Sequence, residues 1–133
     1  MQSRKCRIRL YPQYENLLSL ETFIRACPLL SEESRHRAVL IATEYFDNII
    51  SHSKCLNFLP VSIVVSSNAV IRLRLSYSSV NFNEMVSGHM TASPHFDIPS
   101  GRYRGLGLRM CRNLSRHIEY KKGLFRHHII IKL

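Results

Sequence analysis

The sequence lacks any long uninterrupted apolar segment. Its longest charge-free stretch, residues 55–71, contains Pro60 together with several serine and asparagine residues. These residues divide it into two short segments instead of one membrane helix. The N-terminus is polar and basic and has no apolar core of a signal peptide. We therefore expect a cytoplasmic protein with no membrane-spanning segment.

Clustered cysteine and histidine ligands are also missing. The four cysteines, at positions 6, 27, 55 and 111, form no C-x-x-C pair, and the seven histidines form neither H-x-x-x-H nor H-E-x-x-H. This spacing argues against a zinc site and, in a reducing compartment, against disulfides. His127 and His128 are adjacent in a strand-like run, so their rings should face opposite sides of a sheet and cannot chelate one metal together.

Acidic residues are scarce. The chain has 9 Asp and Glu residues against 19 Lys and Arg residues, a formal net charge of +10. Such a charge favours an anionic partner, whether nucleic acid, nucleotide or an acidic protein surface. Charge alone does not choose between these partners and a solvated basic surface. No helix-turn-helix or RRM-type motif accompanies the charge, so we do not expect direct nucleic-acid binding.

The length of 133 residues fits a single domain covering 1–133. Residues 78–103 are rich in Ser, Asn, Gly, Pro and His, and we expect no regular structure there. The order of elements predicts an α+β two-layer sandwich, with a mixed four- to five-stranded sheet and about three helices on one face. Apolar periodicity predicts strands at 6–11, 61–65, 70–77, 118–121 and 126–133, and helices at 14–26, from Ser31 to about His52, and from Gly105 with Leu108, Leu114 and Ile118 on its apolar face.

The first candidate motif lies on the second predicted helix. Glu44 and Asn48 are spaced i, i+4 and share one helical face, beside the apolar stripe of Ile41, Tyr45 and Ile49. A carboxylate at the edge of the core can accept a proton, and a carboxamide oxygen can coordinate Mg²⁺. The same spacing also occurs at an ordinary polar helix edge.

The second candidate motif opens the last predicted helix. Gly105 and Gly107 follow Arg104 there, and backbone N–H groups at a helix start can hold phosphate. A short G-x-G is also common as a flexible link into a helix. Because an arginine at a helix start opposes the helix dipole, its presence favours an anionic ligand.

Taken together and in order, these segments resemble the GHKL (histidine-kinase-like) ATPase superfamily, and within it the anti-sigma factor serine kinases. The stretch Glu44-x-x-x-Asn48-x-x-x-His52-Ser53 is similar to the N-box of that family. The resemblance implies that Glu44 is the catalytic base, that Asn48 binds Mg²⁺ and that His52 lies at the nucleotide site.

The segment from Arg104 to Leu108 is similar to the glycine box of the same family. The resemblance implies that the N–H groups of Gly105, Leu106 and Gly107 hold the ATP phosphates and that Arg104 offsets their charge. The stretch of about residues 80–103 would then be the mobile ATP lid, with Asp97, Arg102 and Arg104 on its phosphate side or at its hinge. A loop without a ligand is an equal alternative for this stretch.

The adenine-binding box departs from the family pattern. Tyr77 stands where the family has the aspartate that reads the adenine amino group, and Ser79 stands where it has glycine. The missing charge-assisted hydrogen bond is worth roughly 1.5–3 kcal/mol. Its loss should weaken ATP binding by about tenfold to a few hundredfold. The Tyr77 ring could fill the purine pocket, or it could stack on the base.

The resemblance implies an anti-sigma-type regulator that uses ATP and Mg²⁺ to phosphorylate a serine of an anti-sigma antagonist. The alternative is a non-catalytic regulator of the same fold, which binds a sigma factor or its antagonist without ATP. In that case Arg109, Arg112 and Arg116, spaced i, i+3 and i+7, would form a docking surface for an acidic protein. Small kinases of this branch typically dimerise, so a homodimer is one option.

Overall fold

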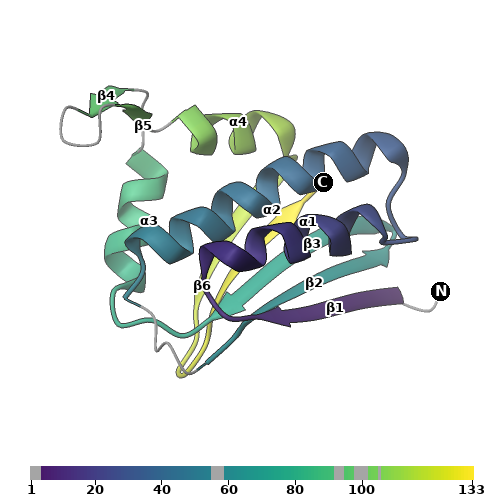
Figure 1. Ribbon diagram of the computed structural model, residues 1–133, viewed down its shortest axis with the longest axis horizontal. Coiled ribbons are helices and arrows are strands. Elements are labelled where there is room, and N and C mark those ends of the chain that lie inside the picture. Colours follow the sequence, from purple (N-terminus) through teal and green to yellow (C-terminus); the bar gives the residue numbers. More distant parts are fainter. Residues whose placement is uncertain (1–3, 55–58, 92–94, 98–101, 105) are drawn as a thin grey trace.

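The chain folds into two layers, a five-stranded sheet and a layer of helices on one of its faces (Figure 1). The computed structural model describes residues 4–54, 59–91, 95–97, 102–104 and 106–133, with side chains for 4–54, 59–87 and 107–133. The predicted α+β sandwich is confirmed. In chain order the elements are β1 (Arg4–Leu10), the 3-10 turn η1 (Tyr14–Asn16), α1 (Leu17–Arg25), α2 (Glu32–His52), β2 (Val61–Asn68), β3 (Val70–Tyr77), α3 (Phe82–Thr91), β4 (His95–Asp97), β5 (Arg102–Arg104), α4 (Leu106–Leu114), β6 (His117–Lys122) and β7 (His127–Lys132).

The strand order of the sheet is β1-β2-β3-β7-β6, and each neighbouring pair is antiparallel. The expected mixed sheet is therefore wrong for the described strands. The reason is the position of β7. Strands β3 and β6 run in the same direction, but β7 inserts between them and pairs antiparallel with both. The short strands β4 and β5 form a separate antiparallel pair.

The core lies between the sheet and helices α1 and α2, which lie side by side over it (Figure 1). Strand alternation directs every second side chain to this side. Each fully buried aliphatic side chain contributes about 1.5–3 kcal/mol to folding. The fully buried members include Leu20 and Ile24 of α1, Ile41, Tyr45 and Ile49 of α2, and Ile63, Leu73, Leu75, Ile129 and Ile131 of the sheet.

Helix α2 begins and ends where its sequence predicts. The Ser31 hydroxyl accepts a hydrogen bond from the Ser34 N–H at 3.2 Å, and Glu32 and Glu33 lie in the first turn, where the helix dipole favours negative charge. The helix ends at His52, since Ser53 is extended. Strands β2 and β3 are joined at Ala69, which adopts a φ of 61°.

Two sequence predictions are wrong. Helix α3 spans ten residues of the stretch expected to lack regular structure. Its buried Phe82 and Met85 are one turn apart, and this short apolar repeat is the signal that the composition of the stretch obscured. Ile118 does not lie on the apolar face of the last helix, because α4 ends at Leu114, whereas the strand predicted from Ile118 is confirmed as part of β6.

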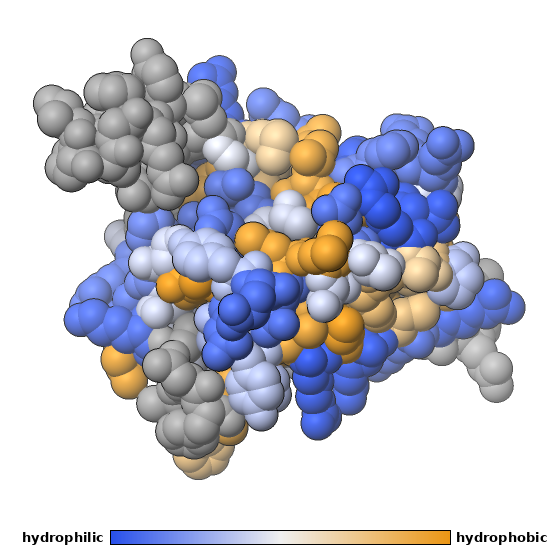
Figure 2. Space-filling model, in the orientation of Figure 1, coloured by the Kyte–Doolittle hydropathy of each residue, from blue (hydrophilic) through white to orange (hydrophobic). Residues whose placement is uncertain are grey.

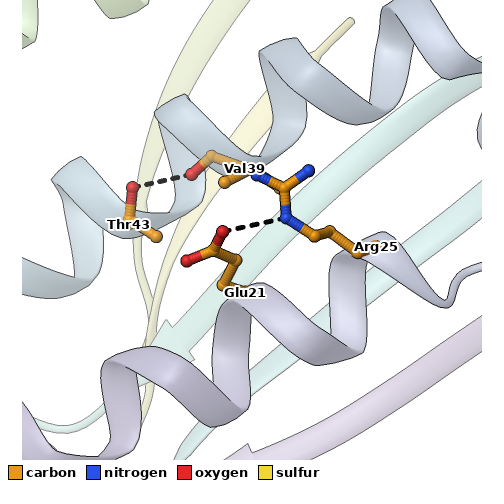
Figure 3. Close-up of polar contacts among 4 residues, drawn as sticks. All are labelled: Glu21, Arg25, Val39 and Thr43. Carbon is orange, nitrogen blue, oxygen red and sulfur yellow. Dashed lines mark hydrogen bonds and ion pairs between the residues drawn. The ribbon is translucent and has the colours of Figure 1, made fainter.

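The exposed side of the helical layer is mixed in polarity (Figure 2). Leu18 of α1 and Leu40 of α2 are exposed among polar neighbours. Arg25 Nε lies 2.8 Å from Glu21 Oε1, and the Thr43 hydroxyl donates to the Val39 carbonyl at 2.7 Å (Figure 3). The ion pair is about half exposed and adds little to stability. In the described part of the chain, each helix is too short or too polar to cross a membrane.

Candidate functional site

The two predicted motifs meet in space because α2 and α4 pack antiparallel. At one end of α4, the Glu44 carboxylate of α2 lies against Gly107. At the other end, the Arg37 guanidinium donates to the Leu114 carbonyl at 3.3 Å. An arginine at the last carbonyls of a helix is favourable for the helix dipole. These two contacts fix the direction of α4 across α2.

The approach of Glu44 leaves little room for a side chain at position 107. A Cβ atom built on Gly107 would overlap the Glu44 carboxylate. Gly107 is in the first turn of α4, where the positive end of the helix dipole stabilises an anion. The Glu44 carboxylate thus lies beside the helix start to which the family resemblance assigns the ATP phosphates.

Cys111 lies one turn further along α4 and is fully buried. Burial raises the pKa of its thiol to about 12, and the nearby negative charge of Glu44 contributes to the rise. The thiol is therefore neutral at physiological pH. It is an apolar neighbour of Glu44 and not a nucleophile.

Asn48 follows Glu44 by one helical turn and is half-buried. Its Nδ2 atom is buried and has no hydrogen-bond partner among the described residues. A buried amide donor without a partner costs about 1–3 kcal/mol, so a ligand oxygen at this position would be stabilising. One amide and one carboxylate suit Mg²⁺, which usually takes few protein ligands and keeps waters and phosphate oxygens. The described residues contain no group of three His, Cys, Asp or Glu side chains that could bind a metal by themselves.

His52 ends α2 with an exposed side chain. Its carbonyl accepts a hydrogen bond from Asn81 Nδ2 at 2.8 Å, and Asn81 Oδ1 accepts one from the Lys54 N–H at 2.8 Å. Asn81 therefore connects the end of α2 to the start of α3. Sequence reasoning missed this residue, although an asparagine directly before a helix is a common cap.

Tyr77, at the end of β3, is only 1% exposed. Its ring centroid lies 6.0 Å from that of Phe82 and 6.3 Å from that of His127, both in edge-on geometry. Phe82 and His127 stack on each other at 4.4 Å. The Tyr77 hydroxyl donates to the Met85 sulfur at 3.5 Å. We call Tyr77, Phe82, Met85 and His127 the aromatic cluster.

Ser79 continues the same segment. Its Oγ atom is buried without a hydrogen-bond partner among the described residues, and its carbonyl accepts from His127 Nε2 at 3.1 Å. Both positions of the altered adenine box, Tyr77 and Ser79, thus contact the aromatic cluster. His127 faces the helices, whereas the His128 ring bonds to Ser76 Oγ at 2.7 Å on the other side of the sheet. The prediction that these two rings diverge is confirmed.

The remaining predicted phosphate-side residues are described in part. Arg104 lies in β5 and Leu106 begins α4, but both side chains, and Gly105 as a whole, lie outside the described residues. Asp97 and Arg102 are paired in the register of β4 and β5, again without described side chains. The roles of these residues stay predictions.

A cleft of about 440 Å³ lies beside the start of α3 and the β6–β7 turn. Its lining includes Ser79, Asn81, Phe82, Lys122, Phe125 and His127, but neither Glu44 nor Asn48. Three apolar side chains at this cleft are strongly exposed: Val80 at 74%, Leu124 at 89% and Phe125 at 80%.

The predicted basic docking face on the last helix is not continuous. Arg109 and Arg112 are exposed on α4, but Arg116 lies beyond the end of this helix at Leu114. The i, i+7 partner is therefore not on the same helical face.

No family model matches the sequence, and no curated protein matches it. Among solved structures, the chain is similar to the crystal structure of the RsbU and RsbW domains of Rv1364c from Mycobacterium tuberculosis, with a TM-score of 0.61 and 13% identity. The match covers 97% of this chain and 32% of that chain, so this chain spans about a third of its length. At this identity the likeness establishes the fold alone. The chain has the α+β sandwich of the histidine-kinase-like ATPase fold.

Proposed function

We propose that this chain is a protein-binding regulator of the anti-sigma type. In it, the part of the nucleotide site that would hold the adenine base, which we call the base end, is closed. The observation that carries the proposal is the burial of Tyr77 at 1% exposure in the aromatic cluster. Tyr77 stands where the family resemblance places the residue that reads adenine. A base could enter there only if this ring left the cluster.

Opening the cluster would be costly. Tyr77 and Phe82 are both buried, and exposing one buried aromatic side chain costs about 1.5–3 kcal/mol, with about 0.5–1.5 kcal/mol more for each broken ring pair. The adenine would also lack the carboxylate that it meets in the family. Both effects act against binding, so we expect ATP affinity to fall beyond the millimolar range.

At the phosphate end, nucleotide binding would need a cation. The Glu44 carboxylate already lies at the first turn of α4, beside Gly107. A phosphate placed there would meet this negative charge at close range unless a cation lay between them. Asn48 is the residue that would hold Mg²⁺, which would supply such a cation.

A protein partner is supported by the exposed apolar side chains Val80, Leu124 and Phe125. Contiguous exposed apolar side chains often mark a protein interaction site. The structural neighbour contains domains named RsbU and RsbW, and the sequence resembles anti-sigma factor serine kinases. A sigma factor or its antagonist is therefore the partner that we propose.

Calorimetric titration with ATP and ADP, with and without Mg²⁺, tests the proposal. We expect neither heat nor a thermal shift at millimolar nucleotide. Micromolar Mg²⁺-dependent binding that Asn48→Ala weakens would contradict the closed site. Asp47→Ala, on the neighbouring position of α2, is the matched control because Asp47 does not belong to the motif.

A serine-protein kinase is the second candidate, and the meeting of Glu44 with Gly107 favours it. Glu44 would accept the proton of the attacking serine hydroxyl, while the α4 N-terminus would stabilise charge on the transferred phosphoryl group. Transfer of labelled γ-phosphate to a protein antagonist, abolished by Glu44→Gln, would establish this activity. Absence of transfer together with partner binding would leave the non-catalytic regulator.

A further inference from the structure

The sheet has a second face, which the helices leave open. Within the described part of the chain, α1 and α2 pack on the other face (Figure 1), and the core contains Ile63 and Val65 of β2 but not Val64 between them. Residues directly opposite each other in an antiparallel sheet point to the same side. The register therefore shows which side chains share the open face.

Basic residues dominate this open face. Arg7, Val64, Arg74, Ile130 and Glu119 form its central row across β1, β2, β3, β7 and β6. The rows on either side add further basic residues in the same way. The eight basic residues of the face are Lys5, Arg7, Arg9, Arg72, Arg74, Lys121, Lys132 and Arg126, the last of which lies next to Arg9.

The acidic residues are on the other side of the molecule. Glu119 is the one acidic residue in the register of the open face, and Lys121 lies 3.6 Å from it. In contrast, η1, α1 and α2 together carry six acidic and three basic residues. With eight basic residues and one acidic residue, the open face carries seven of the ten net positive charges of the chain.

A second observation supports a positive potential on this face. The pKa of His128 is lowered by burial first, then by Arg74 on β3, Arg126 and Lys121 on β6, which share its face, and by the adjacent His127 on the other face. Arg74 Nε is buried without a hydrogen-bond partner among the described residues. An anion at this face would offset the positive potential around His128 and could accept a hydrogen bond from Arg74 Nε.

The composition of the face indicates the kind of anion. Val64, between Arg7 and Arg74 in the register, is only 3% exposed, and the stems of long basic side chains can cover apolar surface in this way. None of the exposed large apolar residues of the described chain is in the paired register of this face, although Tyr11 directly follows β1. Protein interfaces depend on exposed apolar and aromatic anchors, whereas nucleic-acid interfaces are more polar and strongly positive.

The same composition favours a duplex over a single strand. The register places no Phe, Tyr or Trp side chain on the described open face, so bases have no aromatic platform on which to stack. Two basic stripes, Lys5-Arg7-Arg9 on β1 and Arg72-Arg74 on β3, flank Ser62, Val64 and Ser66 of β2. The stripes are about 10 Å apart, two strand spacings, and hydroxyl groups between them can donate to phosphate.

We propose that the open face of the sheet binds the phosphate backbone of duplex nucleic acid without reading its sequence. The sequence alone gave no motif for this function, because the basic residues come from four strands and converge only in the folded sheet. The proposal does not depend on the nucleotide site or on the protein partner.

Fluorescence anisotropy with a labelled 20-base-pair duplex at several salt concentrations tests it. We expect micromolar binding at low salt, with log K falling against log salt at a slope of about −5 to −7. The double variant Arg7→Gln/Arg74→Gln should reduce the slope by about 2 and weaken binding about 50-fold at 0.1 M salt. Lys5→Gln/Arg9→Gln, on the exposed edge strand, should act in the same way.

The control is Lys54→Gln/Arg109→Gln, which removes the same charge from exposed positions outside the sheet. It should leave the slope within about one unit of the wild-type value. Equal losses in both kinds of double variant, or no binding at 50 mM salt, would overturn the proposal. Poly-L-glutamate that binds as tightly as the duplex, and is equally sensitive to Arg7→Gln/Arg74→Gln, would overturn it in favour of an acidic protein partner.

Discussion

At Gly107 the Glu44 side chain of α2 lies against α4, because a Cβ atom there overlaps the Glu44 carboxylate. Gly107→Ala should displace this carboxylate, which is the end of a flexible side chain. Alanine also favours the helix by about 1 kcal/mol over glycine. We therefore expect Gly107→Ala to stabilise the protein less in the wild-type background than in Glu44→Ala.

Urea unfolding of the wild type, Gly107→Ala, Glu44→Ala and the double variant forms a double-mutant cycle, which measures the coupling free energy between the two residues. We expect the two substitutions to differ from additivity by about 1 kcal/mol. Additivity within about 0.3 kcal/mol would mean that Glu44 and Gly107 do not interact. Leu108→Ala, at the next position of α4, is a control for general changes in that helix.

The pKa of His128 reports the potential of the open face. Its pKa is lowered from 6.5 by burial first and then by Arg74, Arg126, His127 and Lys121. Because the unfolded state then binds the proton more strongly, His128 favours folding less as pH falls below about 6.5. Arg74→Gln should raise this pKa, as followed by NMR titration of the imidazole, whereas Arg109→Gln should not change it. An unchanged pKa in Arg74→Gln would contradict the assigned cause.

At the scale of elements, Asn81 holds the end of α2 against the start of α3. Its side chain makes two hydrogen bonds of 2.8 Å, to the His52 carbonyl and from the Lys54 N–H. Each contributes about 0.5–1.5 kcal/mol, so Asn81→Ala should lower the free energy of unfolding by about 1–3 kcal/mol. Asn81→Asp keeps an oxygen that accepts from the Lys54 N–H, so its free energy of unfolding should fall by about half as much. Chemical denaturation of both variants checks the order, and an equal loss in the two would contradict it.

The elements differ in how far the sequence predicts them. Strong apolar periodicity and the Ser31 cap were sufficient for α2, and alternation was sufficient for β2 and β3. Helix α3 was missed because few apolar residues, Phe82 and Met85 among them, stand in a polar stretch. The insertion of β7 between β3 and β6 is a long-range pairing that no local pattern contains.

The candidate site was also predictable only in part. The family resemblance predicted that Glu44 and Gly107 belong to one site, and the structure places them in contact. The sequence left open whether Tyr77 stacks on a base or fills its pocket. The contacts of Tyr77 with Phe82 and His127 depend on the pairing of β3 with β7 and on α3, so no local pattern could decide between the two.

On the scale of the whole molecule, charge is unevenly distributed between the open face and helices α1 and α2. Acidic residues prevail on η1, α1 and α2, and basic residues prevail on the open face of the sheet. The net charge of +10 therefore describes a polarised molecule instead of a uniformly basic one. Such a molecule can present one face to an anion while the helical layer and the cleft stay available to a protein.

In the proposed function, the aromatic cluster closes the base end of the nucleotide site. Residue-resolved NMR of the labelled protein with ATP and Mg²⁺ tests this closure. We predict that the amide signals of Tyr77, Phe82 and His127 and the side-chain amide of Asn48 do not shift at millimolar nucleotide. Saturable shifts of these signals at micromolar ATP, together with the Asn48 amide, would show that the cluster opens and that the chain binds nucleotide.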